Sequence, residues 1–229
     1  ALPVKNGWCL AMDKSDNSMA VAIFGGTFDP IHNGHLTIAR DLAQLLGVSE
    51  VRMVPCAYPP HRGEPNVSTE HRRAMLATAL SHNDSPLIID DIELRRSAPS
   101  YSINTVKLLR QEIGAVAPLF MCIGMDALSK LDSWHQWQQI LDFCHIAVSS
   151  RPGYEQPEAG PLVKWIACHR SDDLSEIKRK PSGCIYFCDL SMLDISSTNI
   201  RVKVAKGDDV HLMLPDSVIS YIQKNRLYE

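Results

Sequence analysis

The chain has 229 residues, which is long enough for one α/β domain with a sizeable core. Hydrophobic residues make up 45% and charged residues 21%, a globular balance that excludes general disorder. The formal net charge of -3 supplies no overall attraction to nucleic acid, so small nucleotides suit this chain better than DNA or RNA.

Residues 1–18 are polar and aperiodic, and we expect a loose N-terminal extension before a single domain over 19–229. Short apolar runs predict strands at 20–24, 51–56, 86–90, 118–123, 145–149 and 184–188. Helical patterns alternate with these runs at 34–46, 68–82, 101–113, 125–131, 134–141, 197–206 and 215–225. The alternation favours an α/β fold with a Rossmann-like, doubly wound parallel sheet, helices on both faces and a C-terminal helical portion.

Two features are predicted to lie at the surface. The segment 151–183 is the least regular, with prolines and glycines around a polar, basic middle, and is predicted to be a surface excursion. Arg72 and Arg73 form a basic pair on a predicted helix, and we expect both to be solvated.

The sequence excludes two further classes. No segment approaches the roughly 18–20 apolar residues of a membrane span, and no basic region followed by an apolar one opens the chain, so we expect a cytoplasmic protein. The seven cysteines contain no CxxC pair, and Cys184, Cys188 and His169 have too few ligands for structural zinc. No metal held by protein side chains is predicted.

The stretch from Gly25 to Leu36 joins a predicted buried strand to a helix through adjacent glycines, which allow a sharp turn and a close approach by phosphate. A helix start offers unpaired amides and partial positive charge to an anion. His32 and His35 are three residues apart, so both rings can reach neighbouring oxygens of one polyphosphate. The simpler alternative is an ordinary loop with two structural histidines, but the combination with Thr27 favours a phosphate site.

A second candidate motif spans Ile195 to Arg201. Ser196, Ser197 and Thr198 lie at a predicted helix start, where hydroxyls and amides can bind phosphate oxygens. These residues alone would more simply be a helix cap. Arg201 follows one turn later on the same side and, together with the first motif, favours phosphate binding.

These motifs resemble the HxGH and ISSTxxR signatures of a nucleotidyltransferase superfamily that also includes class I aminoacyl-tRNA synthetases. Further matches occur in the order expected of bacterial nicotinate-mononucleotide adenylyltransferases, at 59–62, 99–102, 124–126, Trp134 and 151–153. The resemblance runs from about Met19 to the C-terminus. It implies adenylyl transfer from ATP, with Mg²⁺ on its phosphates, to nicotinate mononucleotide, giving nicotinate adenine dinucleotide and pyrophosphate in NAD biosynthesis.

The resemblance also implies roles for individual residues. The catalytic residues would be His32, His35 and Arg201, with His35 donating to the α-phosphate. The ATP-binding residues would be Gly25, Gly26, Thr27, Phe28, Gly34, Gly124, Asp126, Ser196, Ser197 and Thr198. The residues that bind nicotinate mononucleotide would be Arg62, Ser102, Thr105, Trp134, His135 and Arg151.

Several of these roles have simpler alternatives. Arg62, expected to hold the mononucleotide phosphate, could be a solvated loop arginine. Asp126, expected on the ribose hydroxyls, could be a helix N-cap, and Trp134, expected to stack on the pyridine ring, could pack in the core. Relatives generally carry Thr where Ser102 stands and often an aromatic residue where His135 stands, so the preference for the acid over the amide is less determined than the reaction class.

Three other functions compete with this interpretation. Related adenylyltransferases act on nicotinamide mononucleotide or phosphopantetheine, and the phosphopantetheine enzymes and cytidylyltransferases lack the combination of 59–62, 99–102 and Trp134. A nucleotide sensor without turnover would need a defective catalytic motif, whereas the motif histidines are both present. An NAD-dependent dehydrogenase is disfavoured because no GxGxxG follows the first predicted strand.

Overall fold

The computed structural model describes residues 20–57, 64–81, 86–96, 100–149, 159–190 and 193–229. These residues form a six-stranded, wholly parallel sheet in the order β3-β2-β1-β4-β5-β6. The strands are β1 (Val21–Gly26), β2 (Glu50–Pro55), β3 (Leu87–Ile89), β4 (Leu119–Gly124), β5 (His145–Ser149) and β6 (Ile185–Cys188). Each lies within two residues of its predicted position, and the order is that of a doubly wound fold, as expected.

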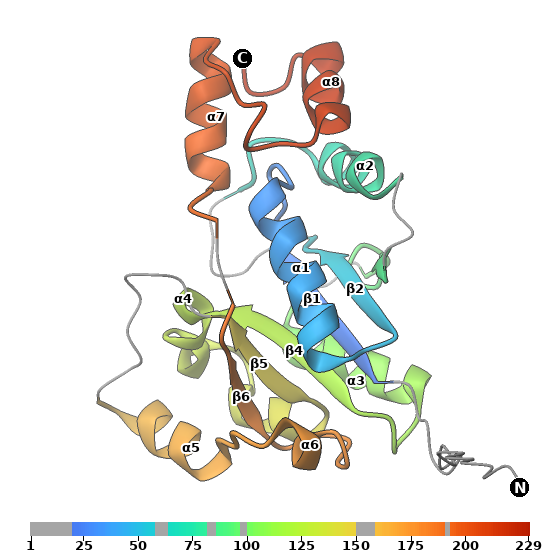
Figure 1. Cartoon of the computed structure of the whole chain (residues 1–229), viewed down its shortest axis with the longest axis vertical. Coiled ribbons are helices and arrows are strands. Elements are labelled where there is room, and N and C mark those ends of the chain that lie inside the picture. Colours follow the sequence, from blue (N-terminus) through green and yellow to red (C-terminus); the bar gives the residue numbers. More distant parts are fainter. Residues whose placement is uncertain (1–19, 58–63, 82–85, 97–99, 150–158, 191–192) are drawn as a thin grey trace, which may run out of the picture.

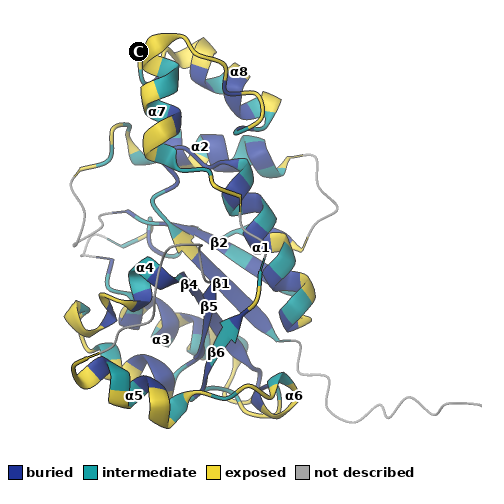
Figure 2. Cartoon of the chain, turned by 60° about the vertical axis from the view of Figure 1, so that its left-hand side comes forward, coloured by how far each residue is buried: buried dark blue, intermediate teal, exposed yellow. Residues whose placement is uncertain are grey.

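The sheet separates two apolar cores, which confirms the prediction of helices on both faces (Figures 1 and 2). The first core is formed with α1 (Asn33–Leu46), α2 (Thr69–Leu80) and α8 (Asp216–Asn225). The second is formed with α3 (Ser102–Ile113), α4 (Met125–Leu128) and α5 (Pro161–His169). Because both faces are covered, β4 and β5 are apolar runs whose side chains are almost all buried.

Helix boundaries follow local chemistry. Gly47 ends α1 in the left-handed conformation, with φ 57°, and its N–H donates to the Ala43 carbonyl. The Ser68 hydroxyl caps α2 by accepting from the His71 N–H, and Gly207 ends α7 (Ser197–Lys206) at φ 74°. The helices α7 and α8 lie with α2 beyond one end of the sheet (Figure 1), which confirms the C-terminal helical portion.

Three predicted segments differ from the structure. The helix predicted at 134–141 is a 3₁₀ segment, η2 (Trp137–Asp142), and the one at 125–131 is split into α4 and the 3₁₀ turn η1 (Leu131–Ser133). The segment predicted to be an irregular surface excursion does lie mostly at the surface over 159–183, but it is helical in part, because it contains α5 and α6 (Leu174–Ile177). Gly160 and Pro161 begin α5 rather than interrupt structure, because proline is well tolerated in the first helical turn.

Arg110, near the end of α3, joins the amino ends of three strands. Its guanidinium donates to the carbonyls of Ala117 at 2.6 Å, Phe143 at 2.9 Å and Pro181 at 2.6 Å, which precede β4, β5 and β6, and to that of Gly114 at 2.9 Å. Burial lowers the pKa of Arg110. One side chain therefore links the segments that lead into three neighbouring strands.

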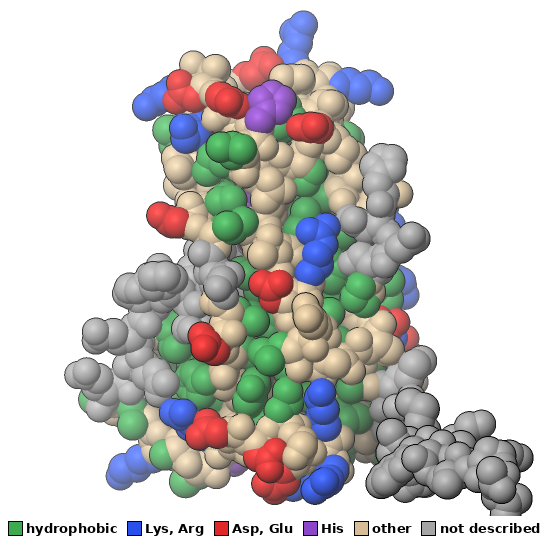
Figure 3. Space-filling view, in the orientation of Figure 1, with side chains coloured by type: hydrophobic (Ala, Val, Ile, Leu, Met, Phe, Trp, Pro, Cys, Tyr) green, Lys and Arg blue, Asp and Glu red, His purple; other side chains and the backbone are tan. Residues whose placement is uncertain are grey.

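The surface carries no large charged patch in the view of Figure 3, where acidic and basic side chains are interspersed. Within the described ranges, no helix is both long enough and apolar enough to cross a membrane.

Candidate active site

A cleft of about 620 Å³ opens at the carboxyl ends of β1 and β4, where the strand order reverses. Ligands of open α/β sheets bind at such a switch point. The cleft brings together most of the predicted site residues, namely Gly25, Gly26, Thr27, Phe28, His32, His35, Ser102, Thr105, Gly124, Asp126, Trp134, His135, Ser196, Ser197, Thr198 and Arg201. Gly34 does not line it, and Arg62 and Arg151 lie outside the described residues, as does the predicted extension.

Gly25 and Gly26 end β1, and the turn that follows them is shaped around Phe28. A Cβ on Gly26 would lie 2.7 Å from the Phe28 ring, so this position needs glycine. Phe28 has φ 51° and is 1% exposed, and its ring packs edge-on against His35 with 5.3 Å between centroids. Gly25 is exposed, and a Cβ there would meet only the Val54 carbonyl oxygen at 4.0 Å. The turn therefore leaves room for a ligand at Gly25 and supports the histidines from below.

The two histidines of the first motif lie against each other, with ring centroids 3.6 Å apart and planes 23° apart. His32 is 1% exposed and caps α1, because its Nδ1 accepts the His35 N–H at 3.3 Å. An imidazole nitrogen that accepts a hydrogen bond carries no proton, so the His32 proton is on Nε2. His35 is partly exposed and presents its ring to the cleft. A Cβ on Gly34 would lie 3.1 Å from the His32 ring, so packing against His32 is one reason for glycine at this position, and its contact with ATP stays a prediction.

The amides at the start of α1 are less available than the sequence suggests. The Asn33 N–H donates to the Met213 carbonyl at 2.9 Å, and the His35 N–H is engaged by His32. Phosphate binding at this end of the helix would therefore depend more on the imidazoles and the helix dipole than on main-chain donors.

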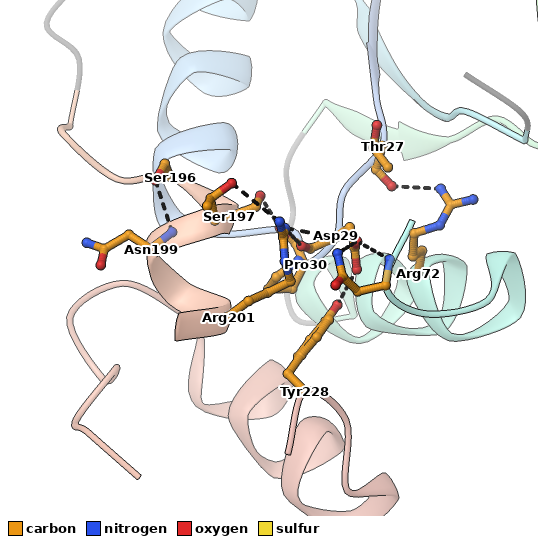
Figure 4. Close-up of polar contacts among 11 residues, drawn as sticks. Thr27, Asp29, Pro30, Arg72, Ser196, Ser197, Asn199, Arg201 and Tyr228 are labelled. Carbon is orange, nitrogen blue, oxygen red and sulfur yellow. Dashed lines mark hydrogen bonds and ion pairs between the residues drawn. The ribbon is translucent and has the colours of Figure 1, made fainter. Parts of the chain in front are cut away.

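The second motif lies beside the first (Figure 4). Ser197 Oγ donates to the Pro30 carbonyl at 3.0 Å, and Arg201 Nη1 donates to the Asp29 carbonyl at 2.8 Å. Arg201 Nη2 also donates to Thr198 Oγ1 at 3.3 Å. The Ser196 hydroxyl accepts the Asn199 N–H, so the helix-cap alternative is right for this side chain. The loop before His32 thus holds the start of α7 at the cleft.

Arg72 contradicts its prediction as a solvated residue, because it is fully buried. Its Nη1 donates to the carbonyls of Thr27 at 2.7 Å and Cys56 at 2.8 Å, which follow β1 and β2. These carbonyls face α2 where water is excluded, and the guanidinium supplies the donors that they need. Burial lowers the pKa of Arg72. Arg73, the next residue, is exposed as predicted and forms a 2.7 Å ion pair with Asp91.

The opposite wall of the cleft carries the residues expected on the pyridine ring and ribose. Trp134 is partly buried against the second core, and His135 is exposed with its ring 4.6 Å from that of Tyr101. Gly124 is the N-cap of α4, so the N-cap alternative for Asp126 is wrong. A Cβ on Gly124 would lie 2.5 Å from Asp126 Oδ1, so the absence of a side chain at Gly124 lets the Asp126 carboxylate lie close to the strand end.

Sequence reasoning missed a buried polar network behind this wall. Thr105 Oγ1 donates to Glu93 Oε1 at 2.8 Å and accepts from Arg96 Nη2 at 2.7 Å. A hydroxyl has one proton, so while Thr105 donates to Glu93 it has none to offer a substrate carboxylate. Glu93 lines the cleft at 8% exposure, and burial raises its pKa. The available signal was the spacing of Glu93 and Arg96, three residues apart and just before 99–102.

A reactive cysteine and a metal ion held by side chains are two other possible sources of chemistry. Cys56 lines the cleft, but burial raises the pKa of its thiol to about 12, which keeps it protonated and a poor nucleophile. Across the part of the chain that the structure describes, no group of three or more His, Cys, Asp or Glu side chains is placed to hold a metal ion.

Comparison with known proteins identifies the family. The sequence model of the cytidylyltransferase-like family matches residues 23–203. The chain is 42% identical over 217 residues to the probable nicotinate-nucleotide adenylyltransferase of Yersinia pestis (strain Pestoides F), covering 94% of this chain and 98% of that protein. The chain belongs to the nicotinate-nucleotide adenylyltransferases, within the cytidylyltransferase-like family. The Serratia proteamaculans (strain 568) relative of the same name is 41% identical over 218 residues, with the same coverage.

Two solved structures share the fold of this chain. Plasmodium falciparum nicotinic acid mononucleotide adenylyltransferase complexed with NaAD superposes with a TM-score of 0.71 at 18% identity, over 92% of this chain and 97% of that one. The same enzyme complexed with APC gives a TM-score of 0.69 at 19% identity, with the same coverage. The family and the fold predicted from the two signatures are therefore confirmed, while the roles of single residues stay predictions.

Proposed function

We propose that this chain transfers the adenylyl group of MgATP to nicotinate mononucleotide, giving nicotinate adenine dinucleotide and pyrophosphate. The observation that carries the proposal is the meeting of both signature motifs at one cleft, through the bonds of Ser197 to Pro30 and of Arg201 to Asp29. The names of relatives about 42% identical over nearly their whole length support the same reaction.

The reaction needs no protein nucleophile. An oxygen of the mononucleotide phosphate attacks the α-phosphorus of ATP in line, a new P–O bond forms, and the bond to the bridging oxygen breaks as pyrophosphate leaves with its electron pair. Catalysis then consists of positioning two anions and stabilising charge on the α-phosphate and the leaving group. Mg²⁺ enters as part of the substrate MgATP and neutralises charge on the phosphates.

We assign the stabilisation to three side chains. His35, which faces the cleft, would donate to a non-bridging oxygen of the α-phosphate, and His32 behind it would hold the ring in place through stacking. Arg201, one turn into α7, would contact the phosphates that leave. Ser197 and Thr198 flank Arg201 and would support the same phosphates.

The acceptor would lie on the opposite wall. We propose that Trp134 stacks on the pyridine ring, and that the His135 amide and Ser102 receive the pyridine carboxylate. The main-chain N–H of Trp134 already donates to the Leu131 carbonyl at 2.9 Å. We therefore assign the pyridine carboxylate to the main-chain N–H of His135. Thr105 would act by shaping the wall, because its hydroxyl donates its hydrogen bond to Glu93.

The test supplies MgATP with nicotinate mononucleotide, nicotinamide mononucleotide or phosphopantetheine, and measures pyrophosphate release together with the mass of the product. We expect the nicotinate compound to react fastest. Preferential use of phosphopantetheine would contradict the proposal, and binding of MgATP without pyrophosphate release from any acceptor would favour a nucleotide sensor. A parallel preparation of the His35→Ala variant controls for contaminating activity.

A further inference from the structure

We propose that Asp29 is a positioning residue for Arg201 and that Tyr228 holds Asp29 in the required place. The proposal rests on the proposed function in one respect, namely that Arg201 acts on the phosphates of ATP. It concerns a buried anchor that joins the two signature motifs to the end of the chain after α8.

The anchor is centred on the carboxylate of Asp29, whose side chain is 6% exposed (Figure 4). Tyr228 Oη donates to Asp29 Oδ1 at 2.7 Å. On the other side, Asp29 Oδ2 accepts from the Asn66 N–H at 2.8 Å and from Asn66 Nδ2 at 3.2 Å. Segments that follow β1, β2 and α8 are thus held by one carboxylate, which is within reach of a fourth segment, α7.

Arg201 contacts both ends of Asp29. Its Nη1 donates to the Asp29 main-chain carbonyl at 2.8 Å and lies 4.0 Å from the carboxylate Oδ2. With its bond to Thr198, this fixes the guanidinium plane of a side chain that is 24% exposed and lines the cleft. An arginine restrained in this way loses little further conformational freedom when it meets a phosphate.

Burial makes each partner of the carboxylate important. A buried carboxylate is tolerated only when its oxygens accept hydrogen bonds. Loss of one donor leaves a buried oxygen without a hydrogen bond, which costs free energy. Burial and the neighbouring Asp29 charge raise the pKa of Tyr228, so its hydroxyl keeps its proton and remains a donor across the physiological range. Arg72 is buried nearby and places a second positive charge beside Asp29.

The consequence concerns the alignment of Arg201 with ATP. If the Tyr228 hydroxyl is lost, Asp29 must find another donor or shift, and its main-chain carbonyl shifts with it. Arg201 would then meet the ATP phosphates in several orientations instead of one. Among the residues that the structure describes, the hydrogen bonds of this anchor do not reach the wall that carries Trp134 and Ser102, so acceptor binding should change little.

The test is Tyr228→Phe, with Tyr221→Phe as the matched control. Tyr221 also lies in the C-terminal helical portion, and its hydroxyl lies 3.1 Å from His71 Nδ1, away from the cleft. Each variant loses one side-chain hydrogen bond, so both should lower thermal stability to a similar small extent. We expect Tyr228→Phe to lower kcat/KM for MgATP about tenfold, as for the loss of one bond to a charged group, with an unchanged KM for nicotinate mononucleotide. Tyr221→Phe should leave both constants at the wild-type values.

Retention of kcat/KM for MgATP within about twofold in Tyr228→Phe would overturn the proposal. An equal loss of activity in both tyrosine variants would also overturn it, because it would reduce the effect to general destabilisation. Asp29→Asn, which keeps the shape and removes the charge, should reproduce the selective loss for MgATP.

Calorimetric titration with MgATP alone separates this proposal from the proposed function. If the wild type binds MgATP but does not use nicotinate mononucleotide, the proposed function fails while the anchor is still tested. Weaker MgATP binding by Tyr228→Phe than by Tyr221→Phe would then support the anchor, and equal binding would overturn it.

Discussion

The two walls of the cleft are built in different ways. The wall that we propose for the ATP phosphates, here called the phosphate wall, consists of the glycines that end β1, the start of α1 and the start of α7. Its side chains are held largely by main-chain carbonyls. The opposite wall, proposed for the pyridine ring and here called the pyridine wall, depends on side chains that bind one another, such as Glu93, Arg96 and Thr105. A wall whose side chains are held by the main chain can be recognised from short sequence motifs. A wall held by hydrogen bonds between side chains cannot.

The largest effect should come from the phosphate wall, through His35→Ala. If His35 stabilises charge on the α-phosphate, its removal should lower kcat about 10³-fold, or about 4 kcal/mol, with smaller changes in KM. Steady-state kinetics together with a thermal melt check this, since the fold should be kept. Turnover near the wild-type rate would mean that another group stabilises the transition state.

The next effect concerns the support of that wall. Arg72→Ala leaves the carbonyls of Thr27 and Cys56 buried without their donor, and should lower the free energy of unfolding by about 3 kcal/mol. Arg73→Ala removes an exposed ion pair from the same helix and should cost less than about 0.5 kcal/mol. Urea titration of both variants gives the comparison. Equal losses would show that the burial of Arg72 has no energetic role.

The smallest effect belongs to the pyridine wall and depends on pH. Burial raises the pKa of Glu93, so the folded protein keeps this proton to a higher pH than the unfolded chain. Ionisation therefore costs stability, beginning near the ordinary carboxyl pKa of about 4.3 and complete above the raised folded-state pKa.

Glu93→Gln removes this titration. The stability of the wild type relative to Glu93→Gln should therefore fall as pH rises through that window, by less than either effect above. Urea titrations from acidic to neutral pH measure it. A difference that is constant, or that grows in favour of the wild type, would contradict the assignment.

Much of the fold could be predicted because buried parallel strands are continuous apolar runs bounded by turn residues, as at Leu119–Gly124 and His145–Ser149. The position of the histidines followed from the same logic. Arg72 and Arg73 show where it stops, because the two residues are alike in sequence and differ only in what the folded chain brings to them. The carbonyls that bury Arg72 lie 45 and 16 residues earlier in the chain.

Helix α5 shows a second limit. Pro161 after Gly160 is equally typical of a loop and of a helix start, and only the packing of Leu162 and Ile166 into the second core distinguishes the two. The Glu93 network was missed because its members become a unit only when α3 lies against the chain that precedes it. Short motifs predict where a ligand binds better than they predict what shapes its far side.

Arg110 gives the molecule a division of labour between opposite rims of the sheet. None of the four carbonyls that it binds belongs to a residue lining the cleft. The amino ends of these strands are therefore held by contacts that do not involve the substrate site. Substitutions at the carboxyl ends can alter which nucleotide binds while these contacts stay intact. A catalyst arranged in this way can acquire a new specificity without first having to become more stable.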